Sequence, residues 1–114
     1  MKESNILLIG SGFMAREYLR VLQHLKRDDV TIVGRSAGKV ETLRSEFPSY
    51  EYHIGGLETY LANNKVPKYA INAVSVNQLE QTTVQLLKAG VKSVLLEKPG
   101  ALDTEGLEKL LEAS

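Results

Sequence analysis

A glycine-rich turn, Gly-Ser-Gly-Phe-Met-Ala at residues 10–15, directly follows a short apolar run at residues 6–9. Gly10 permits a tight turn, Gly12 removes a Cβ where backbone must approach a pyrophosphate, and Ala15 keeps the following helix close to a sheet. The helix N-terminus then offers free N–H groups and about half a positive charge to phosphates. The motif predicts a dinucleotide site, with a ligand-free strand-to-helix turn as the alternative. The residues assigned to the cofactor from this turn are Gly10, Gly12, Phe13 and Met14.

The end of the second apolar run indicates which dinucleotide to expect. In an NAD site an acid receives the ribose 2′-OH, whereas in an NADP site basic and hydroxyl residues receive the 2′-phosphate. Here residues 30–33 are followed by Gly-Arg-Ser-Ala-Gly-Lys, and no acid occurs before Glu41. Arg35 can stack on adenine or pair with a phosphate, Ser36 adds a donor, and Lys39 lies near the start of the next helix. The sequence favours NADP over NAD, with an ordinary solvated surface as the alternative for Arg35 and Lys39.

A lysine follows the last apolar run, at residues 94–96, in the segment Glu97-Lys98-Pro99-Gly100. Functional residues in open α/β sheets collect beyond the carboxyl ends of the strands. A lysine there can hold a substrate oxygen and share in proton transfer. From its position alone, Lys98 fits this role and that of an exposed lysine in a surface turn equally well.

Apolar runs and helical patterns alternate along the chain. Short continuous apolar runs are typical of strands buried on both faces of a parallel sheet, and stripes at helical spacing lie between them. This alternation predicts an α/β, doubly wound parallel sheet of the Rossmann type, with five strands in the order 3-2-1-4-5 and helices on both faces. The predicted strands are residues 6–9, 30–33, 52–54, 69–74 and 94–96, and the helices carry the stripes 14–25, 40–47, 57–61, 83–87 and 107–111, the fourth of them ended by Gly90.

Length and composition exclude several classes of protein. The 114 residues allow one domain, residues 1–114, and 14 basic against 14 acidic residues give no net charge for attracting nucleic acid or an anionic membrane. Without cysteine there is no disulfide, iron–sulfur cluster or thiolate zinc site, and His24 and His53 have no partners at ligand spacing, so no metal is expected. No apolar run approaches the ~20 residues of a membrane span, and the N-terminus lacks a signal-peptide stretch. We therefore expect a cytoplasmic protein.

Three stretches resemble one family of oxidoreductases. They are the turn at residues 10–15, Val33-Gly34-Arg35, and Lys-Ala-Gly-Val-Lys-Ser-Val-Leu-Leu-Glu-Lys-Pro at residues 88–99. Together they resemble, over essentially the whole chain, the N-terminal half of the glucose–fructose oxidoreductase / inositol dehydrogenase (Gfo/Idh/MocA) family. The Glu-Lys-Pro element after a helix ending in Ala-Gly is the most specific part. The resemblance implies a nucleotide-binding domain whose full-length relatives oxidise or reduce a sugar, inositol or similar alcohol or carbonyl with NAD(P).

The resemblance also implies roles for individual residues. Lys98 matches an active-site lysine that contributes to substrate binding and proton transfer, Glu97 helps to shape the same loop, and the bond into Pro99 is often cis in the family. The segment Val74-Ser75-Val76-Asn77 is similar in place to the family's Thr-Pro-Asn-x-x-His stretch beside the cofactor. Ser75 and Asn77 are therefore added to the cofactor-binding residues, although Asn77 could instead serve only as a helix N-cap.

The chain departs from the family pattern at three points. Gly34 stands where the family usually has an acid, which strengthens the expectation of NADP. The Thr-Pro and the His of the fourth-strand loop are missing, with Leu79 in the histidine's place. The second α/β domain, which supplies the remaining acid/base residues and the floor of the substrate pocket, has no counterpart in residues 1–114. We therefore expect a domain that binds NAD(P), meets a small-molecule substrate only together with a second domain, and shows little or no turnover alone.

Two other classes of function remain open. A non-catalytic nucleotide-binding sensor or regulatory module would use the same glycine turn, although it has no need of Lys98 at the reaction end of the sheet. A scaffold could bind no ligand and use the fold to pair with a partner. An open sheet edge also invites pairing with another chain, which leaves a homo-oligomer open without predicting one. The identity of the substrate is not encoded in these residues.

Overall fold

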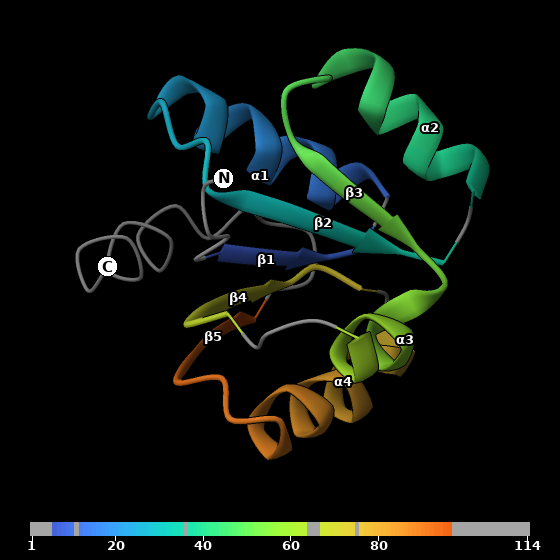
Figure 1. Cartoon of the computed structure of the whole chain (residues 1–114), viewed down its shortest axis with the longest axis vertical. Helices are drawn as coiled ribbons and strands as arrows, with labels where there is room; N and C mark the ends of the chain where they lie inside the picture. Colours follow the sequence, from blue (N-terminus) through green and yellow to red (C-terminus); the bar gives the residue numbers. More distant parts are fainter. Residues whose placement is uncertain (1–5, 11, 36, 64–66, 75, 97–114) are drawn as a thin grey trace.

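The computed structural model is a five-stranded parallel sheet between two helical layers (Figure 1), and it describes residues 6–10, 12–35, 37–63, 67–74 and 76–96. The strands lie in the order β3-β2-β1-β4-β5, which confirms the predicted topology. Helices α1 and α2 cover one face and α3 and α4 the other, as right-handed crossovers require when the strand order reverses at β1. The strands are β1 Ile6–Ile9, β2 Val30–Gly34, β3 Glu51–Ile54, β4 Tyr69–Asn72 and β5 Ser93–Leu96, and the helices are α1 Phe13–His24, α2 Ala37–Glu46, α3 Gly56–Asn63 and α4 Val76–Lys88.

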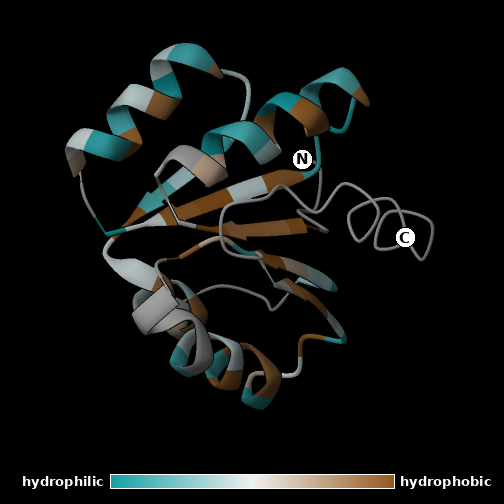
Figure 2. Cartoon of the chain, turned by 180° about the vertical axis from the view of Figure 1, so that it is seen from behind, coloured by the Kyte–Doolittle hydropathy of each residue, from teal (hydrophilic) through white to brown (hydrophobic). Residues whose placement is uncertain are grey.

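The core is organised around the central strand β1, whose four residues are at most 4% exposed. Ile6 and Leu8 pack with the α1 and α2 side, and Leu7 and Ile9 pack with the α3 and α4 side. This two-sided burial explains why the strand is apolar at every position instead of alternating. Figure 2 shows hydrophobic central strands between helices that mix hydrophobic and hydrophilic residues.

The fourth helix differs most from its predicted form. It begins at Val76, seven residues before the predicted stripe, because only Val76 and Leu79 are apolar among its first eight residues and they give a weak helical signal. Leu86 is fully buried, whereas Leu87 is 56% exposed, so the prediction that both face the core was wrong for Leu87. Gly90 ends the helix as predicted: its φ is +98°, its N–H donates to Leu87 O at 3.1 Å, and Val91 N–H donates to Leu86 O at 3.1 Å. The predicted fifth helix lies outside the described residues.

Within the ranges that the structure describes, none of the helices is long and apolar enough to cross a membrane.

Tyr52 on the edge strand β3 joins that strand to the end of α2. Its hydroxyl donates its one proton to Phe47 O at 2.6 Å and lies 3.2 Å from Leu43 O, and its ring centroid lies 5.4 Å from the guanidinium carbon of Arg44. The residue is 8% exposed. Burial away from water, followed by the nearby Tyr50, raises the pKa of Tyr52 to about 12.

These contacts predict a loss of stability at alkaline pH. Because the folded state holds the neutral phenol, its contribution is present below about pH 10 and is lost as the pH rises through about 12. Tyr52→Phe should lower the free energy of unfolding at neutral pH by about 1 kcal/mol, the value of the lost hydrogen bond. The free energy of unfolding should also decline less between neutral and alkaline pH in Tyr52→Phe than in the parent protein. Urea unfolding of both proteins across this range measures the effect, and equal declines would contradict it.

Candidate functional site

The turn between β1 and α1 lies at the carboxyl edge of the sheet, and its first glycine is required by the fold. Gly10 N–H donates to Val33 O at 2.9 Å, and its φ is +125°. A Cβ at Gly10 would lie 2.6 Å from Ala73 O, closer than real Cβ atoms approach a backbone oxygen. Glycine is therefore needed here to let β1 end against the chain that leaves β4, whether or not a ligand is bound.

Gly12 lies in a different environment from Gly10. It precedes α1 with φ −90° and ψ −162°, extended backbone that any residue adopts. Among the residues that the structure describes, none lies within 4 Å of a Cβ built at Gly12. Its carbonyl accepts the Arg16 N–H at 3.2 Å, the first bond of the helix, and no side-chain hydrogen bond caps the helix start. Neither the backbone angles nor the packing of the described residues requires glycine at this position, where glycine is only a better helix N-cap than alanine.

The start of α1 fits the phosphate part of a dinucleotide. The first N–H groups of a helix have no partner within the helix, and its N-terminus carries about half a positive charge. The first turn of α1 holds no acid that would repel an anion. The open space at Gly12 is the space that a pyrophosphate needs in order to reach these N–H groups. Met14 is partly buried against the α1 and α2 side of the core, so it faces the protein interior.

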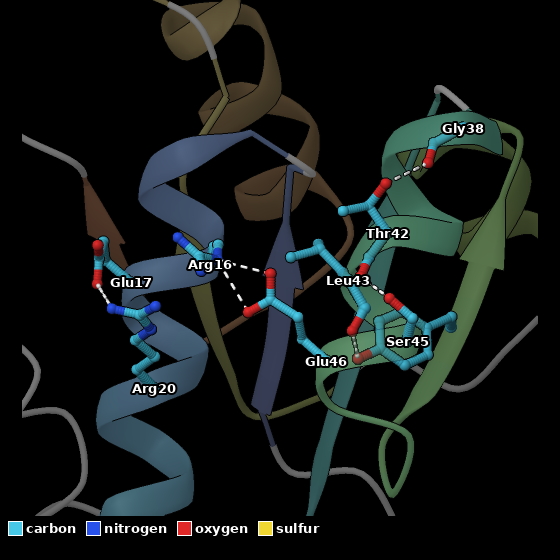
Figure 3. A network of polar contacts seen from close by, with 9 residues as sticks. Arg16, Glu17, Arg20, Gly38, Thr42, Leu43, Ser45 and Glu46 are labelled. Atoms are coloured by element: carbon cyan, nitrogen blue, oxygen red, sulfur yellow. Dashed lines mark hydrogen bonds and ion pairs between the residues drawn. The ribbon is translucent and has the colours of Figure 1, made fainter.

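Arg16, in the first turn of α1, is held by the neighbouring helix α2 (Figure 3). Its Nε donates to Oε1 and Oε2 of Glu46 at 2.8 and 2.9 Å. Within α2, Thr42 Oγ1 donates to Gly38 O at 3.0 Å, and Ser45 Oγ donates to Thr42 O at 2.7 Å. The ion pair joins the start of α1 to the end of α2 and neutralises the Arg16 charge beside the helix N-terminus.

Arg35 follows β2 at the same edge of the sheet. The pairing of Ile9 with Val33 brings the ends of β1 and β2 side by side. Arg35 is exposed and lies against Gly56, the first residue of α3: a Cβ there would be 3.4 Å from Arg35 Cγ and Nε. Within the described part of the chain, no hydrogen bond or ion pair engages its guanidinium. Lys39 is exposed in the first turn of α2.

Asn72 was not singled out from the sequence, yet it is fully buried at the end of β4. It pairs in register with Ile9 of β1, and its Nδ2 donates to Thr83 Oγ1 of α4 at 3.0 Å. A buried amide costs free energy unless it is hydrogen-bonded, so this bond is a specific link between β4 and α4. The signal was present as a single polar residue inside the apolar run at residues 69–74.

Several predicted site residues are not placed by this structure. Ser36, Ser75, Glu97 and Lys98 lie outside the described residues. Asn77 is the second residue of α4, so the alternative that it caps this helix is wrong, because the cap position precedes Val76. In the part of the chain that is described, no group of three His, Cys, Asp or Glu residues is placed to hold a metal ion.

Comparisons with known proteins agree with this architecture. Residues 4–114 match the model of the Gfo/Idh/MocA family, described as "Oxidoreductase family, NAD-binding Rossmann fold". GenD2 from gentamicin A biosynthesis, solved in complex with NAD, has a TM-score of 0.67 at 25% identity, over 99% of this chain and 32% of that one. Biliverdin reductase from Synechocystis sp. PCC 6803, solved with biliverdin and NADP+, has a TM-score of 0.63 at 22% identity, over 96% of this chain and 34% of that one.

The chain thus spans about a third of the length of these solved chains. The structure has the predicted strand order, and the family match covers all but the first three residues. The chain belongs to the Gfo/Idh/MocA oxidoreductase family, with its NAD-binding Rossmann fold, as its motifs predicted.

Proposed function

We propose that these residues form the NADP-preferring cofactor domain of an oxidoreductase that transfers a hydride to or from a sugar, inositol or related alcohol or carbonyl. The family match supports the oxidoreductase class. The single observation that carries the cofactor assignment is the carboxyl edge of β1 and β2. There the open N-terminus of α1 at Gly12 and the guanidinium of Arg35 lie on adjacent strand ends.

The lack of an acid beside Arg35 supports NADP over NAD. A carboxylate at the end of β2 would accept the ribose 2′-OH and repel a 2′-phosphate, whereas an arginine fork attracts the phosphate. β2 and Arg35 contain no carboxylate, and the next acid along the chain is Glu41. Glu41 Oε1 accepts a hydrogen bond from Arg44 Nη1 at 2.6 Å on the exposed side of α2. In this proposal Ser36 and Lys39 support Arg35.

The proposed chemistry lies at the other half of the same edge. Bound NADP(H) supplies or accepts the hydride, and the protein supplies orientation and charge. In the proposal, Lys98 holds the substrate oxygen and exchanges a proton with it. The proposal also assigns Ser75, Asn77 and Glu97 to the binding of the cofactor. The rest of the substrate pocket belongs to a second domain outside these 114 residues, consistent with a chain that spans about a third of its solved neighbours.

The two glycines of the turn should respond differently to alanine. Gly10→Ala should lower the free energy of unfolding by about 2 kcal/mol or more, because the new Cβ meets Ala73 O at 2.6 Å and the backbone has a positive φ. Gly12→Ala should leave that free energy within about 0.5 kcal/mol, since no described residue lies within 4 Å, but raise the Kd for NADPH about tenfold. Urea unfolding and calorimetric titration measure the two effects. Unchanged NADPH affinity in Gly12→Ala would contradict a pyrophosphate at this turn.

Removing Arg35 should change the choice of cofactor. Arg35→Ala should raise the Kd for NADPH about tenfold or more, the value of a charge-assisted contact with phosphate, and leave the Kd for NADH within about twofold. Calorimetric titration with both cofactors gives the ratio. Arg20→Ala is the matched control, because Arg20 is equally charged and exposed but pairs with Glu17 at 3.7 Å on α1. An equal rise in the Kd for NADPH in Arg20→Ala would show only a general effect of charge.

The domain alone should bind the cofactor without turning it over. We expect less than one oxidation of NADPH per protein molecule over hours with sugar and keto-sugar substrates, because the remaining acid/base groups and the pocket floor are proposed to lie elsewhere. Absorbance at the reduced nicotinamide band follows the reaction, and Lys98→Ala serves as the blank. Sustained turnover by the purified chain, abolished in that variant, would overturn the need for a second domain.

A further inference from the structure

We infer that Gly56 is a positioning residue for cofactor choice: its missing side chain lets Arg35 lie across the turn before α3, where its guanidinium can receive the 2′-phosphate. This inference rests on the proposed preference for NADP. Gly56 lies 21 residues after Arg35 in the chain and belongs to none of the stretches that carry the family resemblance. The contact between the two residues is visible only in the folded structure.

The contact involves the stem and the first nitrogen of the guanidinium. A Cβ built on Gly56 would lie 3.4 Å from Arg35 Cγ, 3.4 Å from Nε and 3.9 Å from Cδ. The two separations of 3.4 Å are the shortest that ordinary van der Waals contact allows, and that of 3.9 Å is ordinary, so an added methyl group would touch the arginine and limit how closely its stem can lie on the turn. Arg35 is exposed, and a long exposed side chain samples many rotamers. The backbone of Gly56, which carries no side chain, offers a surface on which the Arg35 side chain can lie.

The turn that bears Gly56 is tied to the residue that precedes Arg35. Gly55 N–H donates to Gly34 O at 3.2 Å, and Gly34 pairs with Ile54 in the β2–β3 register. Thr59 Oγ1 donates to Gly55 O at 3.2 Å, which holds the turn to the first part of α3. Backbone hydrogen bonds therefore fix the turn at Gly55 and Gly56 relative to the start of the Arg35 side chain.

The neighbouring glycine shows that this contact is specific to Gly56. Both glycines have positive φ, +114° at Gly55 and +89° at Gly56, so both favour glycine for backbone reasons. The three described atoms nearest to a Cβ at Gly55 all belong to Thr59, at an ordinary 3.7 Å. Only at Gly56 would it meet the arginine. Glu58 lies in the first turn of α3, and no ion pair joins it to Arg35 within the described residues.

The orientation of Arg35 matters for one cofactor and not for the other. A guanidinium binds a phosphate through two parallel N–H groups, and this fork is effective only when its plane faces the oxygens. The 2′-OH of NADH offers no such partner. A change that moves Arg35 without removing it should therefore weaken NADPH binding selectively.

The test compares Gly56→Ala with Gly90→Ala. Gly90 has a similar φ of +98°, but no described residue lies within 4 Å of a Cβ there, so it carries the backbone strain without the contact. In Gly56→Ala we expect the Kd for NADPH to rise about fivefold and the Kd for NADH to stay within about twofold. In Gly90→Ala the ratio of the Kd for NADPH to the Kd for NADH should equal that of the parent protein. An equal NADPH-to-NADH ratio of Kd values in Gly56→Ala and Gly90→Ala would overturn the inference.

A double-variant cycle separates this inference from the proposed function. In an Arg35→Ala background, Gly56→Ala should cause no further change in NADPH affinity, because the residue through which it acts is gone. If Arg35→Ala weakens NADPH but Gly56→Ala does not, Gly56 has no positioning role and the proposed preference stands. If Arg35→Ala leaves the preference unchanged, both are wrong.

A second pair of variants covers the case in which Gly56→Ala does not fold, which circular dichroism would show. Asparagine tolerates positive φ better than other side chains, so Gly56→Asn adds the Cβ with less strain. Gly90→Asn is its control. We expect the same selective rise in the Kd for NADPH in Gly56→Asn only. An unchanged NADPH-to-NADH ratio in this variant would overturn the inference.

Discussion

The close approach of two backbone segments at the carboxyl edge of the sheet is the constraint on which the rest of the structure depends. Gly10 passes so near to Ala73 O that a methyl group would not fit between them, and Ala73 N–H donates to Ile9 O at 2.9 Å. This contact sets the ends of β1 and β4 together while the chain from β1 turns into α1. Because the strand order reverses at β1, the crevice expected to receive ligands in this fold opens at this edge.

Most of the architecture could be predicted from the sequence because the strands are buried on both faces. Continuous apolar runs such as residues 6–9 and 30–33 carry a strong signal, and the reversal of strand order follows from right-handed crossovers. The start of α4 could not be placed, because only Val76 and Leu79 are apolar among its first eight residues, too few to define a stripe. Leu87 was assigned to the core because spacing defines a stripe but not its width, and the sheet covers only the side that carries Leu86.

The candidate site was predictable to a lesser degree, because its parts come together through the fold. The glycine turn and Arg35 were found from their positions after strands, where parallel strands present their carboxyl ends together. Asn72 was not predicted as a buried residue because a single amide in an apolar run can equally mark the point where a strand ends. Its hydrogen bond to Thr83 joins residues eleven apart on two elements, and only the packing of α4 on β4 brings them into contact.

Three glycines near this edge show that one residue type can serve three physical purposes. Gly10 is required by a neighbouring backbone atom, Gly56 by its own backbone angle and by an arginine side chain, and Gly12 by neither. Gly12 has an ordinary backbone conformation, and no described residue lies within 4 Å of its Cβ position, so alanine should cost the fold little. A glycine that the fold does not need is better evidence for a ligand than one that it does. The second glycine of the motif therefore points to a bound pyrophosphate, whereas the first would be needed in an empty turn as well.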